Sequence, residues 1–256
     1  MQDPVDCRPS DVLPINNSTD EEEEEEEEES TSSSEDEDSA RWQKNLNRIL
    51  AESRYATEKD KFALFGKDMV NLFMQIKPIR EKQVKFEICF LENVDLRNAK
   101  FPTCIVVNVG GKNNERHWIV LLSFQKQNWI LFDSYGRTIY EIYAENRMPM
   151  NFSGIYWSNL GGDYQSEYSV LCGYYCAVFA HVALTDPHCR NDPRNLQKYL
   201  DFYFHDFRNQ PKNQMTFTTT INDITCLTIF KNVFDYSSIP EAAKFIETIG
   251  KELAEG

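Results

Sequence analysis

The sequence predicts one α+β domain over residues 41–256, preceded by a disordered acidic tail over residues 1–40. Three observations lead to this prediction. The net charge of −14 comes from the tail, because residues 20–38 hold fourteen carboxylates and no Lys or Arg. Apolar residues recur at helical spacing near both ends of the remaining chain. Between them lie four apolar runs that are typical of buried strands, and this separation of helices from strands defines the α+β class.

The acidic segment cannot bury apolar surface and repels itself, so we expect it to be disordered. It can serve as a solubilising tail or as a regulatory element, and the sequence leaves both functions open. Residues 1–40 carry 17 acidic residues and one basic residue, so the net charge of residues 41–256 is about +2. Because the body has no dense Lys/Arg stripe, duplex-DNA binding is not expected as its main task.

Two helices are predicted before residue 85. The first has Trp42, Leu46, Ile49 and Leu50 on one face, and the second has Phe62, Phe65, Met69, Leu72, Phe73 and Ile76 on one face. Pro78 is expected to close the second helix. The four predicted strands cover 85–94, 103–109, 117–124 and 128–136. They are apolar on both faces, which favours a central, mostly antiparallel sheet flanked by helices.

The C-terminal half is predicted to be helical. After a mixed stretch over 140–164, small and apolar residues at helical spacing predict a helix over 169–184, which Asp186-Pro187 stops. Two further helices are expected over 194–207 and 241–253.

The predicted hairpin between the third and fourth strands brings two polar residues together. With a three-residue loop at 125–127, Phe124 pairs with Asn128, and His117 then lies opposite Tyr135. Asp133 is two residues from that partner, so it is a diagonal neighbour of His117, with Cβ atoms about 7–8 Å apart. We therefore expect Asp133 to hold the imidazole ring of His117.

Cys172 is predicted to lie at the start of the helix that follows the Gly161-Gly162 loop. Unpaired N–H groups in a first helical turn stabilise a thiolate, and a nearby imidazolium adds to this effect. Gln165, seven residues earlier, could complete an oxyanion hole with the backbone N–H of Cys172. Gly173 lacks a side chain and could let a substrate backbone approach.

Each of these residues also has a structural interpretation. Asp133 could simply end a strand, His117 could be a buried core histidine, and Cys176 is expected to be a small core residue. A metal-stabilised binding module is a separate alternative, with Cys172, Cys176, His188 and Cys189 as ligands. Structural zinc sites prefer cysteines two residues apart in turns, whereas Cys172 and Cys176 have three residues between them in an apolar helix, so no metal site is expected.

Three segments together resemble the adenovirus-protease (adenain) family of cysteine endopeptidases. They are CIVVNVGGKNNERHW, LFDSYG and QSEYSVLCGYYCAVFAHVAL, and they are most similar to relatives encoded by Maverick/Polinton elements and related DNA viruses. The resemblance covers about residues 100–185, with a weaker similarity that extends to Phe207 and to Ile221-Asn222-Asp223. It implies a papain-like fold in permuted order, with His117 as general base, Asp133 as its orienter, Cys172 as nucleophile and Gln165 at the oxyanion hole. Trp118 and Gly173 are then expected to contact the substrate.

The resemblance also implies a biological setting. It implies cleavage near Gly in precursor or capsid proteins of a virus or mobile element, by a monomer in the host nucleus or the virion. An activating peptide or DNA would fit the family, but residues 137–164 contain no cysteine to tether such a peptide, so no cofactor is required. The start of the chain lacks a signal pattern, no apolar run reaches membrane-spanning length, and the odd count of seven cysteines fits a reducing compartment. We therefore expect an intracellular protein that is not secreted.

The main alternative is a deconjugating or processing protease for a ubiquitin-like modifier. The SUMO-protease group, which is distantly related to the adenain family, uses the same four residue types in the same order and cleaves after Gly-Gly. The phenylalanine-rich C-terminal half gives no sign of a modifier-binding surface, so the endopeptidase is preferred.

Overall fold

The computed structural model describes the chain from residue 63 onward, with gaps. The described ranges are 63–109, 117–150, 152–165, 169–190, 192–207, 215–237, 239–240, 242–244 and 246–247, without the side chains of 215–220. The acidic tail predicted over residues 1–40 and the helix predicted to begin near Trp42 lie outside the described residues.

Five strands form one sheet in the order of the sequence, and the fold is α+β as predicted. The strands are β1 (Lys85–Phe90), β2 (Thr103–Asn108), β3 (Trp118–Gln125), β4 (Asn128–Phe132) and β5 (Tyr156–Leu160). The central strands β2, β3 and β4 pair antiparallel, whereas the outer pairs β1–β2 and β4–β5 are parallel. The sheet is therefore mixed, and the expectation of a mostly antiparallel sheet is wrong. The outer strands can pair in parallel because the long connections between β1 and β2 and between β4 and β5 return the chain to the same end of the sheet.

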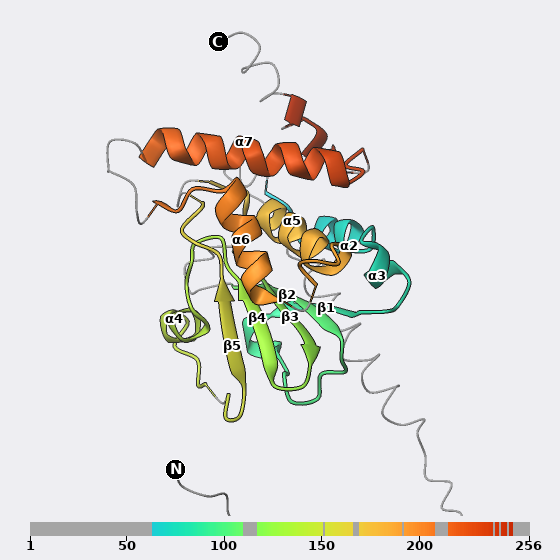
Figure 1. The fold of residues 1–256 in the computed structure, drawn as a ribbon, viewed down its shortest axis with the longest axis vertical. Coiled ribbons are helices and arrows are strands. Elements are labelled where there is room, and N and C mark those ends of the chain that lie inside the picture. The colour runs from blue at the N-terminus through green and yellow to red at the C-terminus, as the bar shows by residue number, and fades with distance from the viewer. Residues whose placement is uncertain are drawn as a thin grey trace, which may run out of the picture.

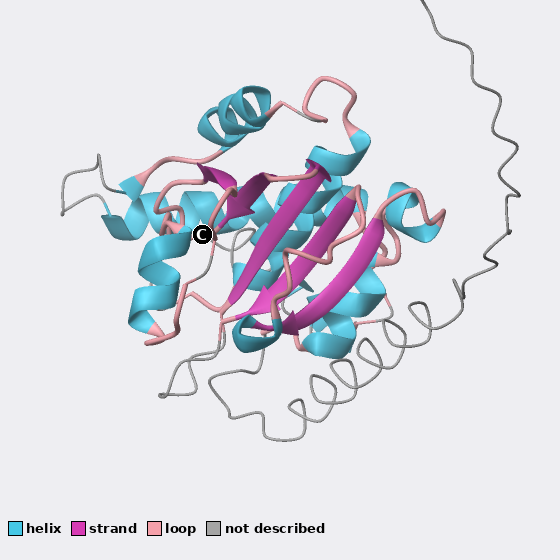
Figure 2. Ribbon diagram, turned by 90° about the horizontal axis from the view of Figure 1, so that it is seen from below, coloured by secondary structure: helices cyan, strands magenta, loops and turns pink. Residues whose placement is uncertain are grey.

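Helices cover both faces of the sheet (Figures 1 and 2). One face packs against a layer formed by α2 (Gly66–Phe73), α3 (Lys77–Arg80), α5 (Cys172–Thr185), α6 (Pro193–Tyr203) and α7 (Met215–Val233). The other face packs against α4 (Ile139–Glu145) and its neighbouring loops. On β3, Val120 and Leu122 join the first apolar cluster, whereas Ile119 and Leu121 join the second. This double covering explains why the predicted strands are apolar on both faces.

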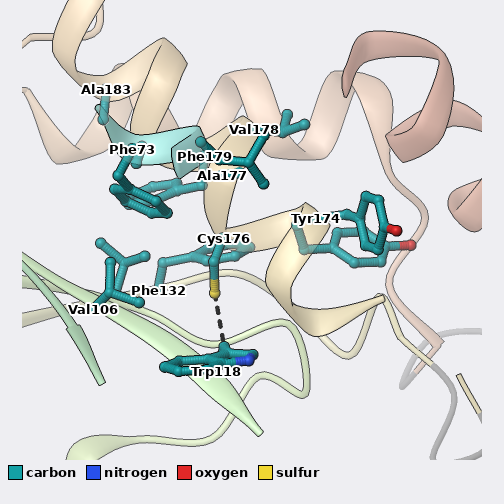
Figure 3. Close-up of a cluster of buried hydrophobic side chains, with 14 of the residues drawn as sticks. Phe73, Val106, Trp118, Phe132, Tyr174, Cys176, Ala177, Val178, Phe179 and Ala183 are labelled. Atoms are coloured by element: carbon teal, nitrogen blue, oxygen red, sulfur yellow. Dashed lines mark hydrogen bonds between the residues drawn. The ribbon is translucent and has the colours of Figure 1, made fainter. Parts of the chain in front are cut away.

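Helix α5 is the buried centre of the helical layer. Twelve of its fourteen residues are buried, which explains why its sequence shows no polar stripe. It packs on the sheet through Phe179, whose ring stacks on that of Phe132 with centroids 4.4 Å apart (Figure 3). Burial on all sides fixes the position of its first residue, Cys172, relative to the sheet.

The predicted second helix is shorter in the structure and is followed by a separate helical turn. Helix α2 ends at Phe73, and Pro78 lies in the first turn of α3, where its missing N–H would have had no helical partner. Pro78 therefore begins a short helix rather than closing a long one. Helices α4 and α7 and strand β5 were not predicted. Over the described part of the chain, no helix has the length and apolar character to cross a membrane.

Candidate functional site

The hairpin of β3 and β4 brings His117 and Asp133 together at one end of the sheet. His117 immediately precedes β3, and Asp133 immediately follows β4. The register of the hairpin, with Val120 opposite Phe132, is the predicted one. The His117 ring stacks on Tyr135 with centroids 4.2 Å apart and an interplanar angle of 14°, so these two predicted neighbours are in contact.

The turn of this hairpin differs from the prediction. Gln125 pairs with Asn128, so the turn contains two residues rather than three, and Gln127 adopts a positive φ of 73°. A β-bulge between Leu122 and Gln125 then shifts the register by one residue. The hydroxyl of Ser123 lies 2.6 Å from the carbonyl oxygen of Gln125 and 2.5 Å from that of Asn128. The bulge therefore restores the register that a longer turn would have given.

His117 and Asp133 form a buried ion pair. Nε2 of His117 lies 2.6 Å from Oδ1 of Asp133, and the two residues are 5% and 0% exposed. Oδ1 of Asp133 also accepts a hydrogen bond of 3.0 Å from the backbone N–H of Tyr135. The carboxylate is thus held by its own turn, and it fixes the tilt of the imidazole ring.

Arg137 is a member of this cluster that sequence reasoning missed. Its Nε donates to Oδ2 of Asp133 at 2.8 Å, and its Nη1 donates to Glu145 at 2.8 Å. The guanidinium also lies over the Tyr135 ring, 5.3 Å from its centroid. The available signal was an Arg four residues after Asp133 in a turn, which is short enough for the side chain to fold back.

The charges of the pair support each other. Burial alone would lower the pKa of His117, but the charge of Asp133 and its hydrogen bond outweigh burial and raise that pKa to about 9. Burial alone would raise the pKa of Asp133, but His117 and then Arg137 lower it to about 2. At neutral pH the site therefore contains an imidazolium next to a carboxylate.

Cys172 is the first residue of α5, as predicted, and it is 6% exposed. Its side chain lies close enough to the ring to contribute to the raised pKa of His117. Asp133 takes Nε2, and the other ring nitrogen, Nδ1, is buried without a regular hydrogen bond in the described part of the chain. The contact of the ring with the thiol is therefore looser than its contact with Asp133.

The side-chain amide of Gln165 is held in one orientation. Its Nε2 donates to the carbonyl oxygen of Ser169 at 2.7 Å, and its Oε1 accepts from the Ser134 hydroxyl at 2.7 Å. Because a carbonyl oxygen only accepts hydrogen bonds, the nitrogen must face Ser169. The backbone N–H of Gln165 also donates to the carbonyl of Ser134, at 3.2 Å. Gln165 is thereby joined to the turn that follows Asp133 and to the segment that leads into Cys172.

Two glycines permit the close approach of the Gln165 loop to the Asp133 turn. A Cβ added to Gly161, which has a φ of 99°, would lie 2.7 Å from the carbonyl oxygen of Asp133. A Cβ on Gly136, with a φ of 67°, would lie 2.9 Å from the backbone of Gly162. The predicted loop at Gly161-Gly162 is therefore packed directly against the turn that carries Asp133.

Trp118 and Gly173 pack inside the protein instead of lining an open surface for substrate. Trp118 is 3% exposed, and its indole N–H donates to the carbonyl of Leu64 at 2.9 Å. A Cβ on Gly173 would lie 3.0 Å from both the Leu64 Cβ and the Met69 Sδ. The expectation that both residues contact substrate is therefore corrected, since the segment before α2 already covers them.

Cys176 is a core residue, as predicted. It is fully buried, its thiol donates to the carbonyl oxygen of Trp118 at 3.1 Å, and burial raises its pKa (Figure 3). Among the described residues, no group of three or more His, Cys, Asp or Glu side chains is arranged to hold a metal ion.

Comparisons with known proteins add little to this geometry. No family model matches the sequence, and no curated protein matches it significantly. Among solved structures, a chain described as the crystal structure of the de-sumoylating protease aligns with 69% of this chain and 83% of its own length. That alignment has 13% identity and a TM-score of 0.32.

Proposed function

We propose that this chain is a cysteine endopeptidase with a papain-like arrangement of its elements in permuted order. The observation that carries the proposal is the buried pair of His117 and Asp133, 2.6 Å apart, with Cys172 beside the ring at the first residue of a helix. Nucleophile, base and orienter in contact with one another are the recognised signature of covalent catalysis.

In the proposed reaction, the Cys172 thiolate attacks the carbonyl carbon of the scissile peptide bond. The raised pKa of His117 keeps a proton on the ring at neutral pH, and His117 delivers this proton to the leaving amine as the C–N bond breaks. The resulting thioester is hydrolysed by water, from which His117 removes a proton as general base. Asp133 stabilises the imidazolium and fixes its orientation throughout.

The Gln165 amide supplies the proposed oxyanion donor. One of its two N–H bonds is used by Ser169, and the other is assigned to the developing oxyanion, together with the backbone N–H of Cys172. The orientation of the amide by Ser134 and Ser169 supports this role, because a donor fixed before the reaction does not have to reorganise during it.

The proposed substrate is a precursor or capsid protein that is cleaved near Gly. The motif resemblance supports this substrate class. A mass-spectrometric cleavage profile on a proteome-derived peptide library would test it, with Cys172→Ala as the inactive variant. Cys176→Ala is the matched control, one turn further along α5. Cleavage that depends on Cys172 and tolerates Cys176→Ala is expected. Equal cleavage by the wild type and Cys172→Ala would overturn the proposal.

The same experiment separates the two substrate classes when a second arm is added. Modifier precursors that end after Gly-Gly, and the corresponding isopeptide-linked conjugates, are incubated beside the peptide library. Cleavage at many internal Gly-containing sites supports the endopeptidase. Turnover restricted to the modifier substrates would replace it with the deconjugating protease.

A further inference from the structure

Helix α7 contributes a buried asparagine that forms hydrogen bonds with the loop before Gln165. Asn222 is 0% exposed, and its Nδ2 donates to the carbonyl oxygens of Tyr164, at 3.1 Å, and His205, at 2.7 Å. Its Oδ1 accepts the backbone N–H of His205 at 2.9 Å. Both N–H groups and the oxygen are therefore used, and no other side chain of this size offers two donors and one acceptor in this geometry.

The next residue of α7, Asp223, forms hydrogen bonds at the other end of the same loop. The carboxylate of Asp223 accepts a hydrogen bond of 3.0 Å from the Tyr175 hydroxyl and another from the Ser169 hydroxyl. Tyr175 lies on α5, one turn after Cys172, and its hydroxyl also lies 3.5 Å from the carbonyl oxygen of Tyr164. Asp223 thus fastens the segment that enters α5 to α7.

Gln165 lies between these two attachment points. Its backbone follows Tyr164, which Asn222 holds, and its side-chain nitrogen donates to the carbonyl of Ser169, which Asp223 holds through the hydroxyl. We infer that Asn222 and Asp223 are positioning residues that place the Gln165 amide for oxyanion stabilisation. This inference rests on the proposed function and extends it to a helix that contributes no reacting group.

Positioning by Asn222 and Asp223 matters because an oxyanion donor must be placed precisely. Stabilisation of a developing oxyanion requires a donor within hydrogen-bond reach of the charge, and small displacements cost large factors in rate. Ser134 holds Gln165 from the Asp133 side, and Gln197 of α6 holds Gly161 and the Tyr164 hydroxyl. Asn222 and Asp223 hold the loop at points closer to the Gln165 amide, at the Tyr164 carbonyl and at Ser169. Loss of either anchor should move the amide without changing the Cys172 and His117 pair.

The test compares Asp223→Ala and Asn222→Leu with Leu227→Ala. Leu227 is a buried residue of the same helix and serves as the control for loss of packing in α7. On a substrate that the wild type hydrolyses, the first two variants should lower kcat by about tenfold or more while KM changes by less than about twofold. The decrease in kcat should not exceed the decrease in Gln165→Ala, since removal of an oxyanion donor typically costs about 10²–10³ in kcat. Asp223→Asn, which retains an acceptor oxygen, should recover most of the activity.

Two readouts distinguish positioning from general stability. First, Asp223→Ala should lower kcat by less than about twofold when added to Gln165→Ala, because both changes remove the same interaction. Second, the side-chain amide NMR signal of Gln165, assigned by its loss in Gln165→Ala, should shift in Asp223→Ala and stay in place in Leu227→Ala. Losses that multiply in the double variant, or an unmoved amide signal, would overturn the inference. The NMR readout needs no substrate, so it decides whether Asp223 positions the Gln165 amide, whereas absence of Cys172-dependent cleavage would separately reject the proposed function.

Discussion

Replacing Asp133 by Asn tests the electrostatic basis of the site with almost no change in shape. The carboxylate of Asp133 is the main reason that the buried ring of His117 carries a proton at neutral pH. Asn keeps the size and one acceptor oxygen but removes the charge. Burial of the ring then has little to oppose it, and burial lowers the pKa of a histidine.

The expected change is large. With a pKa of about 9, about one His117 ring in a hundred is neutral at pH 7. In Asp133→Asn the pKa should fall below 6.5, its ordinary value, so the ring becomes mostly neutral at pH 7. A fall of at least about 2.5 pH units corresponds to about 3 kcal/mol of lost imidazolium stabilisation. Since the neutral ring has no proton for the leaving amine, kcat at pH 7 should fall, though less than in His117→Ala.

The assay is an NMR titration of the imidazole signals between pH 5 and about 10. The chain has four histidines, and the His117 signal is assigned by its loss in His117→Gln. Thermal unfolding of each variant shows whether the fold is retained. An Asp133→Asn protein whose His117 still titrates near 9 would refute the reasoning, because the carboxylate would then not be the source of the raised pKa.

Arg137 provides a control of opposite sign. Its guanidinium lies on the far side of Asp133 and lowers the pKa of that carboxyl group. In Arg137→Met, the positive charge that competes with the imidazolium is gone, and Glu145 loses its partner. The pKa of His117 should therefore rise above that of the wild type in the same titration. A fall in Arg137→Met would show that the guanidinium acts by holding the geometry of the turn rather than through its charge.

Two further predictions follow from the packing and from the thiols. Gly161→Ala should lower the free energy of unfolding by about 1–3 kcal/mol and reduce activity, because its Cβ meets the carbonyl of Asp133 at 2.7 Å. Gly154→Ala, also at positive φ but with nothing within 4 Å, should cost less in denaturant unfolding; equal costs would exclude the contact as the cause. Of the six described cysteines, Cys172 should be alkylated first by iodoacetamide, ahead of the similarly exposed Cys189, whose pKa is raised by burial. Peptide mapping that finds Cys89 or Cys226 modified first, with activity retained, would contradict this.

The pairing of His117 with Asp133 was predicted from an assumed three-residue turn, because turn length sets the register of a hairpin. Apolar residues on both faces of a strand do not by themselves fix which residues lie opposite each other. The local turn was not predictable from the same pattern, and the two-residue turn is compensated by a bulge that Ser123 supports. The predicted register near the site is correct although the predicted turn is not, because the bulge between Leu122 and Gln125 shifts the register by one residue.

The missed elements have local sequences that disagree with their final structure. Ten of the nineteen residues of α7 are Thr, Ile or Val, which have low helix propensity, so packing against α5 decides its conformation. Strand β5, with the sequence YWSNL, is short and only partly apolar. Its extended conformation depends on pairing with β4. Such tertiary effects leave no periodic signal in a single sequence.

The roles of Trp118 and Gly173 were mispredicted for a different reason. Both residues were assigned from the resemblance and from their positions beside His117 and Cys172. What covers them is Leu64, which lies more than fifty residues earlier in the sequence. A contact of that sequence separation cannot be inferred from spacing near the site.

The order of these parts along the chain has a consequence for protein synthesis. His117, Asp133, Gln165 and Cys172 all precede residue 173, whereas Asn222 and Asp223 come about fifty residues later. A growing polypeptide that has just emerged with its four reacting side chains still lacks the helix that anchors the Gln165 loop. The proposed protease should therefore gain full activity only after residues 222 and 223 have been translated and α7 has folded onto the loop.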